Sequence, residues 1–277
     1  MTTPLPRRTA LIAAAGLAAA PLAGAKPERR AKAAKAKTFV LVHGTWLGGW
    51  LWTPVVERLT AMGHRVFAPT MTGLGERAHL ISPAVGLDTH ARDVCGVIEA
   101  EELSEVILVG HSFAGVTITE AADRMRDKIG RLVFFDALIP TRAKPAAINP
   151  GPDGQYSDYW RQRIPKFIDG YKMDFFAEYE IEMICPDADK PEIRDRIRRG
   201  VRPHPAKQWT DPASFAHGGW EGLPRTYVHC TQQTYRPSSQ NMWGEAKKPG
   251  WDWIDYPASR AGMLTNPDLT ADLLCGL

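Results

Sequence analysis

The sequence predicts an α/β fold in which a mostly parallel sheet is covered by helices on both faces. Short runs rich in β-branched and aromatic residues alternate with stretches whose apolar residues recur at helical spacing. The strand-like runs are apolar almost throughout, as expected of strands buried on both faces. His43, Ser112 and Asp136 each stand at the end of such a run. Since ligands of parallel sheets bind at the carboxyl ends of strands, these three positions mark the expected site.

The N-terminal segment is expected to be a signal peptide rather than part of this fold. Arg7 and Arg8 precede an apolar run from Ala10 to Ala20, and Ala23-Gly24-Ala25 has the small-x-small form of a signal-peptidase site. The run is too short to span a bilayer comfortably, so we expect residues 1–25 to be cleaved rather than to anchor the protein. The paired arginines match the twin-arginine route in part, and a general secretory signal is the alternative.

Cleavage would leave a nearly neutral mature protein that starts near Lys26. Residues 26–37 are basic and rich in alanine without an apolar stripe, which is typical of a solvated linker. The whole chain has 34 basic and 31 acidic residues, and loss of Arg7 and Arg8 brings the two nearly into balance. We therefore expect a secreted or periplasmic protein with no nucleic-acid partner and no membrane span after cleavage.

The remaining stretch, residues 38–277, is long enough for one large domain, and 44% of the whole sequence is hydrophobic. The four cysteines lie far apart and make no CxxC or zinc-finger spacing. The sequence contains no recognisable nucleotide, flavin or metal motif. We therefore expect no cofactor and no metal.

The domain begins with two strand, loop and helix units. Residues 38–42 form a strand-like run that leads into His43-Gly44-Thr45-Trp46, and a helical pattern follows from about Pro54 to Met62. The second unit has a strand over residues 63–69 and a helix over residues 87–103. The loop at residues 43–46 lies at a strand end, where a ligand of a parallel sheet would bind.

The third unit carries a serine between a strand and a helix. Residues 105–109 predict a buried strand, and residues 115–126 have helical spacing. Between them, Gly110-His111-Ser112-Phe113-Ala114 is similar to the G-x-S-x-G nucleophile elbow, with Ala114 at the second small position and Gly115 one residue later. Small residues are needed because the strained turn brings the strand and helix backbones together and exposes the hydroxyl. Ser112 is therefore the candidate nucleophile, with an ordinary turn as the alternative.

A fourth strand, residues 131–135, ends at Asp136, and the alternation then breaks. Residues 139–224 interleave aromatic residues with charges, and five prolines between residues 186 and 212 interrupt any long helix. The four arginines of residues 192–199 are interpreted as a solvated helix face rather than an anion site. The predicted elements that follow are a strand over 226–230, a helix around 238–247, a strand over 251–256 and a last helix over 267–274.

Five stretches occur in a fixed order: His43-Gly44, Thr72 to Leu80, Gly110 to Gly115, Leu132 to Pro140 and Met263 to Pro267. Together they resemble the α/β-hydrolase superfamily, in the branch of bacterial esterases similar to plant methyl-ester esterases and hydroxynitrile lyases. The resemblance runs from about Thr38 to the C-terminus, and it implies an α/β-hydrolase fold with a cap over the active site at about residues 139–224.

The same resemblance implies roles for individual residues. Ser112 would be the nucleophile, and the backbone N–H groups of Thr45 and Phe113 would form the oxyanion hole. Such backbone donors are preorganised toward the charge that develops on a substrate carbonyl oxygen. Trp46 and His111 are expected to line the substrate pocket.

The sequence departs from the family at the catalytic acid. Many members carry a carboxylate after the strand at residues 226–230, but Thr231-Gln232-Gln233-Thr234 contains none. Asp136 is then the candidate acid, since other members place the acid at the end of the strand that follows the elbow strand. Capping of the next segment by the Asp136 side chain is the alternative.

A second departure concerns the catalytic base. Family members usually have a histidine three residues before the methionine of the Met263 motif, and this sequence has Arg260 there. Arginine cannot accept the serine proton near neutral pH, because its pKa lies above about 12. We expect Arg260 instead to pair with Asp136. Histidines elsewhere in the sequence could replace the missing base, but each could equally have a structural role, and none is assigned as the base.

Three functions are compatible with these residues. The first is an exported serine hydrolase that acts on a small to medium apolar carboxylic ester, with activity weakened or lost because of Arg260. The second is a catalytically silent α/β-hydrolase that binds an apolar ligand. The third is a lyase on the same scaffold, since a fold does not determine the reaction. In all three the expected partner is a small molecule.

Overall fold

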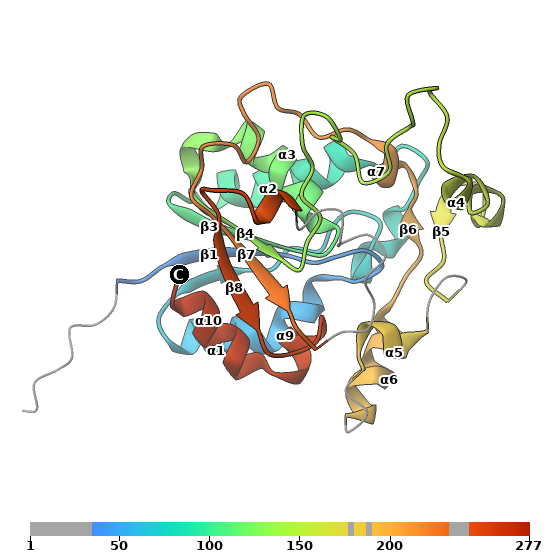
Figure 1. Ribbon diagram of the computed structural model, residues 1–277. Coiled ribbons are helices and arrows are strands. Elements are labelled where there is room, and N and C mark those ends of the chain that lie inside the picture. The colour runs from blue at the N-terminus through green and yellow to red at the C-terminus, as the bar shows by residue number, and fades with distance from the viewer. Residues whose placement is uncertain (1–34, 177–179, 187–189, 233–243) are drawn as a thin grey trace, which may run out of the picture. The chain divides into compact units, whose positions relative to one another are not determined.

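Six parallel strands form one sheet within the residues that the structure describes (Figure 1). The structure is a computed structural model, and it describes residues 35–176, 180–186, 190–232 and 244–277. The strands lie in the order β2-β1-β3-β4-β7-β8. Their bounds are β1 Thr38–Val42, β2 Arg65–Phe67, β3 Val106–His111, β4 Ile129–Phe135, β7 Arg225–Cys230 and β8 Asp252–Tyr256.

The strand register brings the three predicted polar positions to one edge of the sheet. Val42 at the end of β1 is paired with Gly110 of β3, and His111 at the end of β3 is paired with Phe135 at the end of β4. His43, Ser112 and Asp136 follow these strand ends directly. The expected convergence at the carboxyl edge is therefore present, and it follows from parallel pairing of adjacent strands.

Helices cover both faces of the sheet (Figure 1). On one face α2 packs against α3, and on the other α1 packs against α10 and α9. The bounds of these helices are α1 Thr53–Ala61, α2 Leu87–Ala100, α3 Ala114–Arg124, α9 Gly262–Thr265 and α10 Pro267–Cys275. Short 3₁₀ helices connect them: η1 Gly49–Trp52, η2 Gly75–Leu80 and η3 Arg126–Lys128.

The predicted fold class is confirmed, and most predicted elements are present with small shifts of their ends. The predicted strand over residues 63–69 is shorter, since β2 spans Arg65–Phe67, and α2 ends at Ala100 rather than at residue 103. The short helix α9 was not predicted, because four residues carry too little periodicity to be recognised. The expected helix around residues 238–247 lies largely outside the described residues.

The segment between β4 and β7 contains short elements, as the interrupted pattern predicts. They are α4 Asp158–Arg161, η4 Ile164–Lys166, β5 Lys172–Met173, α5 Ile181–Ile184, α6 Pro191–Gly200, β6 His204–Pro205 and α7 Lys207–Thr210. β5 and β6 pair antiparallel, with Met173 opposite His204. Trp160, Phe175 and Trp209 are buried in this segment, so part of its aromatic content is its own core. In the described ranges no helix is both long and apolar enough to cross a membrane.

Candidate active site

Ser112 lies in a strained turn between β3 and α3. Its φ angle is +57°, in the left-handed region that residues other than glycine rarely adopt. The Ser112 N–H donates to the Phe135 carbonyl at 3.1 Å, and the Ser112 carbonyl accepts from the Leu138 N–H at 2.8 Å. The turn is thus tied to the segment after β4, and the predicted strand, turn and helix arrangement is present at Ser112.

The glycines around Ser112 are required by close backbone contacts. A Cβ atom at Gly115 would lie 1.9 Å from the Leu138 carbonyl oxygen, and one at Gly110 would lie 2.8 Å from the Ala114 carbonyl oxygen. Ala114 itself is buried and fits. The structure therefore gives a reason for Gly115 that the short motif does not: α3 touches the chain that leaves β4.

The loop after β1 lies directly against Ser112. A Cβ atom at Gly44 would come within 2.9 Å of the Ser112 Cβ, so this approach depends on glycine. Thr45 and Phe113 are buried next to this contact, and none of the backbone hydrogen bonds among the described residues uses their N–H groups. These two donors could therefore serve a ligand oxygen, which is the role that the resemblance implies for them.

Arg260 connects Ser112 to Asp136. The guanidinium donates from Nη2 to the Ser112 Oγ and from Nη1 to Asp136 Oδ2, each at 2.5 Å. The side chains of Arg260 and Asp136 are 8% and 0% exposed. Because both charges are buried, the pair must be kept together, since an isolated buried charge is very costly. The expected contact between residues 136 and 260 is therefore present.

Asp136 is also held by its own backbone. Its φ angle is +44°, and its N–H donates to the Val228 carbonyl at 2.7 Å. Its carboxylate accepts from Arg260, and capping of the next segment by this side chain stays the alternative. The negative charge of Asp136 also helps burial to raise the pKa of the neighbouring Cys230 thiol well above its usual value. Cys230 is thus a buried neutral thiol.

His43 lies beside the site but is not free to act as a base. The Met71 N–H donates to His43 Nε2 at 3.0 Å, so that nitrogen is the acceptor of the ring. The other nitrogen, Nδ1, then carries the proton and donates to the Gly44 carbonyl at 2.8 Å. Burial lowers the pKa of His43 to about 4. His43 is therefore neutral, and its two hydrogen bonds connect the loop after β1 to the loop after β2.

His111 is buried under Ser112 and faces the aromatic core. Its ring packs edge-on to Trp52 and Phe135. Burial lowers the pKa of His111 well below its usual value, and the positive charge of Arg260 lowers it further. No side chain among the described residues other than Arg260 is hydrogen-bonded to the Ser112 Oγ. The assignment of His111 to the substrate pocket stays a prediction.

The remaining six histidines have structural partners or lie elsewhere, and two of them, His90 and His204, contact the Thr72 carbonyl and the Trp46 N–H. His64 accepts from the Lys37 backbone and contacts Cys275, and His229 contacts Asp255. His217 lies near Asp123, and His79 is exposed. The site therefore contains a nucleophile candidate, a permanent proton donor and a buried carboxylate, without a histidine in the position of a general base.

Trp46 forms the contact between the loop after β1 and the cap. Its φ angle is +63°, its indole Nε1 donates to the Met173 carbonyl at 2.9 Å, and its ring meets Phe175 edge-on. The Phe113 ring lies 5.1 Å from that of Trp209. The surroundings of the predicted oxyanion hole are thus largely aromatic. Trp46 as a lining residue of the substrate pocket stays a prediction.

The structure also explains the Thr72 to Leu80 motif. Asp93 accepts from the Thr72 N–H at 2.6 Å and from the Thr72 hydroxyl at 2.9 Å, and Arg77 donates to Asp93 at 3.0 Å. Arg77 also donates to the Thr70 carbonyl at 2.7 Å. These bonds hold the loop whose Met71 N–H orients His43, so Arg77 and Asp93 are positioning residues.

A buried polar group between residues 139–224 and the rest of the domain was not predicted. His204 Nδ1 accepts from the Trp46 N–H at 3.4 Å, and Gln208 donates to the Thr117 hydroxyl at 3.1 Å. The pKa of His204 is well below its usual value because of burial and the neighbouring His90. No sequence signal identifies these residues, because a lone histidine in an irregular segment is usually a surface residue. In the described part of the chain no group of three or more acidic, histidine or cysteine side chains is arranged to hold a metal ion.

Comparison with known proteins agrees with the α/β fold described above. Residues 39–273 match the family model described as the Alpha/beta hydrolase family. A carbendazim hydrolyzing esterase from Nocardioides sp. (strain SG-4G) is 36% identical over 248 residues, which are 86% of this chain and 98% of that protein. An alpha-hydroxynitrile lyase from Arabidopsis thaliana is 37% identical over 103 residues, which are 37% of this chain and 40% of that protein.

Among solved structures, an extracellular alpha/beta-hydrolase from a Paenibacillus species has a TM-score of 0.68 and 20% sequence identity. The match covers 87% of this chain and 98% of that one. At this level of identity the match shows the fold alone.

Proposed function

The chain belongs to the alpha/beta hydrolase family, and from that premise we propose that it binds a small to medium apolar carboxylic ester and hydrolyses it only slowly, through Ser112. The family and its esterase relatives support a hydrolase of esterase type. Our proposal adds three points: the slow rate, the apolar character of the ester and the absence of the usual histidine base.

One observation carries the proposal: the Arg260 guanidinium donates a hydrogen bond to the Ser112 Oγ. Attack by serine on an ester forms the Oγ–carbon bond and must release the hydroxyl proton to an acceptor. A guanidinium is protonated near neutral pH and has no lone pair to offer. Among the described residues the Ser112 proton therefore has no side-chain acceptor, and we infer that the hydroxyl stays a weak nucleophile.

Other parts needed for ester chemistry are retained. Ser112 is partly exposed in its left-handed turn, and the N–H groups of Thr45 and Phe113 could stabilise the oxyanion of a tetrahedral intermediate. In well-studied serine hydrolases the oxyanion hole and substrate binding alone leave about 10³–10⁴-fold catalysis over water. This residual rate is the activity that we expect here. The aromatic residues around Trp46 support an apolar acyl or alcohol group.

A second candidate is a protein that binds an apolar ligand without turnover. The chain of contacts from Asp136 through Arg260 to Ser112 favours it, because the contacts preserve the shape of the site without its proton chemistry. A lyase is a third candidate, supported by the alpha-hydroxynitrile lyase relative, which matches 37% of this chain.

Labelling with a fluorophosphonate separates the first two candidates. A slow hydrolase is expected to be labelled at Ser112, slowly and more rapidly at high pH, where hydroxide removes the proton. The Ser112→Ala variant controls for labelling elsewhere. No labelling of the folded protein at any pH up to its stability limit would favour the silent binder.

We further propose that the protein is exported and starts near Lys26. The support is the sequence alone: the apolar run from Ala10 to Ala20 and the Ala23-Gly24-Ala25 site. N-terminal sequencing of secreted material would test the cleavage site, and Arg7→Lys with Arg8→Lys would test the twin-arginine route. Intact Met1 on protein retained in the cytoplasm would contradict export.

A further inference from the structure

Two cavities meet at the side chains of Trp50 and Glu76, and neither is lined by Ser112, Asp136 or Arg260. One, of about 340 Å³, lies along α1 and the end of β2. The other, of about 400 Å³, lies against the C-terminal half of α6. We call the two together the Trp50 groove. Its residues come from three stretches of the chain, 49–57, 68–76 and 196–202.

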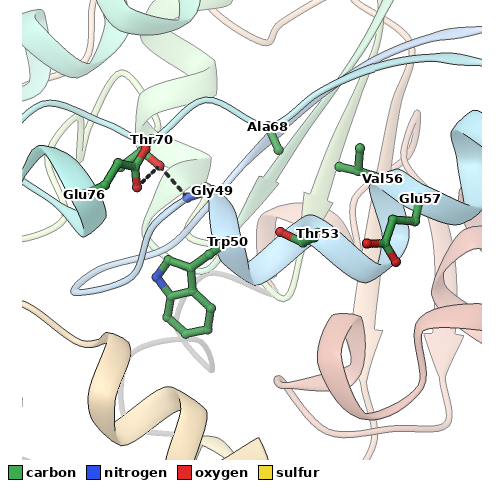
Figure 2. A pocket seen from close by; sticks show the side chains of 8 residues that line it. All are labelled: Gly49, Trp50, Thr53, Val56, Glu57, Ala68, Thr70 and Glu76. Atoms are coloured by element: carbon green, nitrogen blue, oxygen red, sulfur yellow. Dashed lines mark hydrogen bonds between the residues drawn. The ribbon is translucent and has the colours of Figure 1, made fainter.

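The body half of the groove is built on η1 and the loop after β2. Figure 2 shows Trp50 projecting from η1, with Glu76 and Thr70 on one side and Thr53 and Glu57 on the other. Thr70 Oγ1 donates to Glu76 at 3.0 Å and accepts from the Gly49 N–H at 2.8 Å. Glu76 is therefore held by a neutral hydroxyl.

The cap half of the groove is formed by the end of α6. A Cβ atom at Gly200 would lie 2.4 Å from the Trp50 ring, so the backbone of α6 rests directly on the indole. The Arg196 guanidinium lies over the same ring, 5.6 Å from its centroid. Arg199 and Arg202 complete this wall. The groove thus combines a flat aromatic surface with three guanidinium groups.

The arginines of α6 differ in how their charges are satisfied. Arg198 donates to Asp195 at 2.8 Å, away from the groove, whereas Arg196 and Arg199 have no carboxylate partner within the described ranges of the chain. Arg202 donates to the carbonyls of Arg199 and Val201, and so satisfies the C-terminal carbonyls of α6. Two guanidinium groups with available donors therefore line one cavity.

Charges of both signs line the groove, and the guanidinium groups are in the majority. Arg196, Arg199 and Arg202 line the α6 cavity together with the Glu76 carboxylate. Guanidinium groups can only donate, so the complementary group must be an acceptor, and a negative charge suits the two arginines that have no carboxylate partner. The Trp50 indole Nε1 is buried, so the indole offers the groove its ring rather than its N–H.

We propose that the Trp50 groove binds the carboxylate or phosphate group of a small molecule through Arg196 and Arg199, with the body of that molecule lying on the Trp50 indole. The site is separate from the ester site and does not depend on the function proposed for Ser112. Within residues 192–199, Arg198 fits the interpretation as a solvated helix face, whereas Arg196 and Arg199 would form an anion site. A bound anion would also connect α6 of the cap to η1 of the body.

Binding of inorganic phosphate and of benzoate to the full protein tests the proposal and distinguishes the two anion types. Titration calorimetry measures affinity, and Trp50→Phe identifies the fluorescence change that belongs to the groove. We expect Arg196→Gln and Arg199→Gln each to weaken binding of the recognised anion by about tenfold or more, as loss of a charge-assisted hydrogen bond does. Added salt should weaken binding as well.

Arg198→Gln is the matched control, because it removes the same charge from the same helix at the adjacent position. It should change the affinity by less than about twofold, since an exposed charge that faces away is screened by solvent. Ser112→Ala should bind as the unmodified protein does. The proposal is overturned if neither anion binds, if Arg198→Gln weakens binding as much as Arg199→Gln, or if binding is lost in Ser112→Ala.

Discussion

The substitution Arg260→His replaces a permanent proton donor beside Ser112 with a residue that can accept the serine proton. Arg260 contacts both Ser112 Oγ and Asp136 Oδ2 at 2.5 Å, so the two partners of a catalytic histidine are already in place. General base catalysis contributes about 10²–10⁴-fold to such reactions. This corresponds to a barrier lower by about 3–5 kcal/mol.

The structure limits how much of this gain is available. An imidazole is shorter than an arginine side chain, and Ser259, Arg260 and Ala261 are buried in a turn, with the Gly262 N–H bonded to the Ser259 carbonyl at 3.0 Å. A histidine at this position cannot make both contacts unless the turn moves inward. We therefore expect the lower end of the range, about a hundredfold gain in kcat/KM.

The assay compares hydrolysis of short-chain nitrophenyl esters by the unmodified protein, Arg260→His, Ser112→Ala and the double variant. The Arg260→His rate should fall as pH drops through the pKa of the new imidazole, whereas the unmodified protein should show no such step near pH 6.5. Urea denaturation of each variant separates loss of activity from unfolding. Ester binding to the Ser112→Ala forms shows whether the substrate reaches the site.

Two results would refute this reasoning. Rapid Ser112-dependent hydrolysis by the unmodified protein would mean that another group accepts the proton. No gain by a folded Arg260→His protein, on an ester that binds, would mean that more than the base is missing. The silent binder or the lyase would then replace the slow hydrolase.

Three further outcomes are expected from the packing and charges. Gly115→Ala should destabilise the protein by at least about 1–3 kcal/mol, because its Cβ would lie 1.9 Å from the Leu138 carbonyl oxygen. Gly96→Ala is the control: it lies in α2 with open space around it and should stabilise the protein by about 0.5–1 kcal/mol. Urea unfolding of both variants decides this, and equal effects would contradict the contact. Asp136→Asn should cost about 3–5 kcal/mol because it leaves a buried guanidinium without its counter-charge, and a change within error would show that the pair is not buried in solution. Because burial lowers the pKa of His43 to about 4, the unfolded chain binds a proton at this residue at higher pH than the folded chain does. The resulting destabilisation is absent above about pH 6.5, and it should lower the free energy of unfolding by about 2 kcal/mol between pH 7 and pH 5. Urea unfolding at both pH values should show a smaller loss for His43→Asn.

Local sequence patterns were sufficient for the fold and for the nucleophile candidate. Strands β1, β3 and β4 are runs of mostly apolar residues on both faces, and such runs predict burial of the strand on both sides. The elbow at Ser112 is also local, since small residues and a serine between a strand and a helix suffice to indicate the turn. The position of Arg260 in the site was inferred from family resemblance, and not from periodicity or spacing.

Contacts between distant parts of the chain decided the chemistry around that serine. Ser112 and Arg260 are 148 residues apart, and Asp136 and Arg260 are 124 residues apart, so no local pattern specifies that one guanidinium donates to both partners. The same holds for Gly115, whose need for a missing Cβ comes from Leu138 on another segment, and for His43, whose proton location is determined by the Met71 N–H. Likewise, the two different environments of Arg198 and Arg199 depend on where Trp50 meets α6. Periodicity determines which face of an element is buried, but the partner of a buried polar group depends on which distant segments pack together. Loss of that partner is costly in free energy, because the low dielectric of the interior penalises an unpaired polar group.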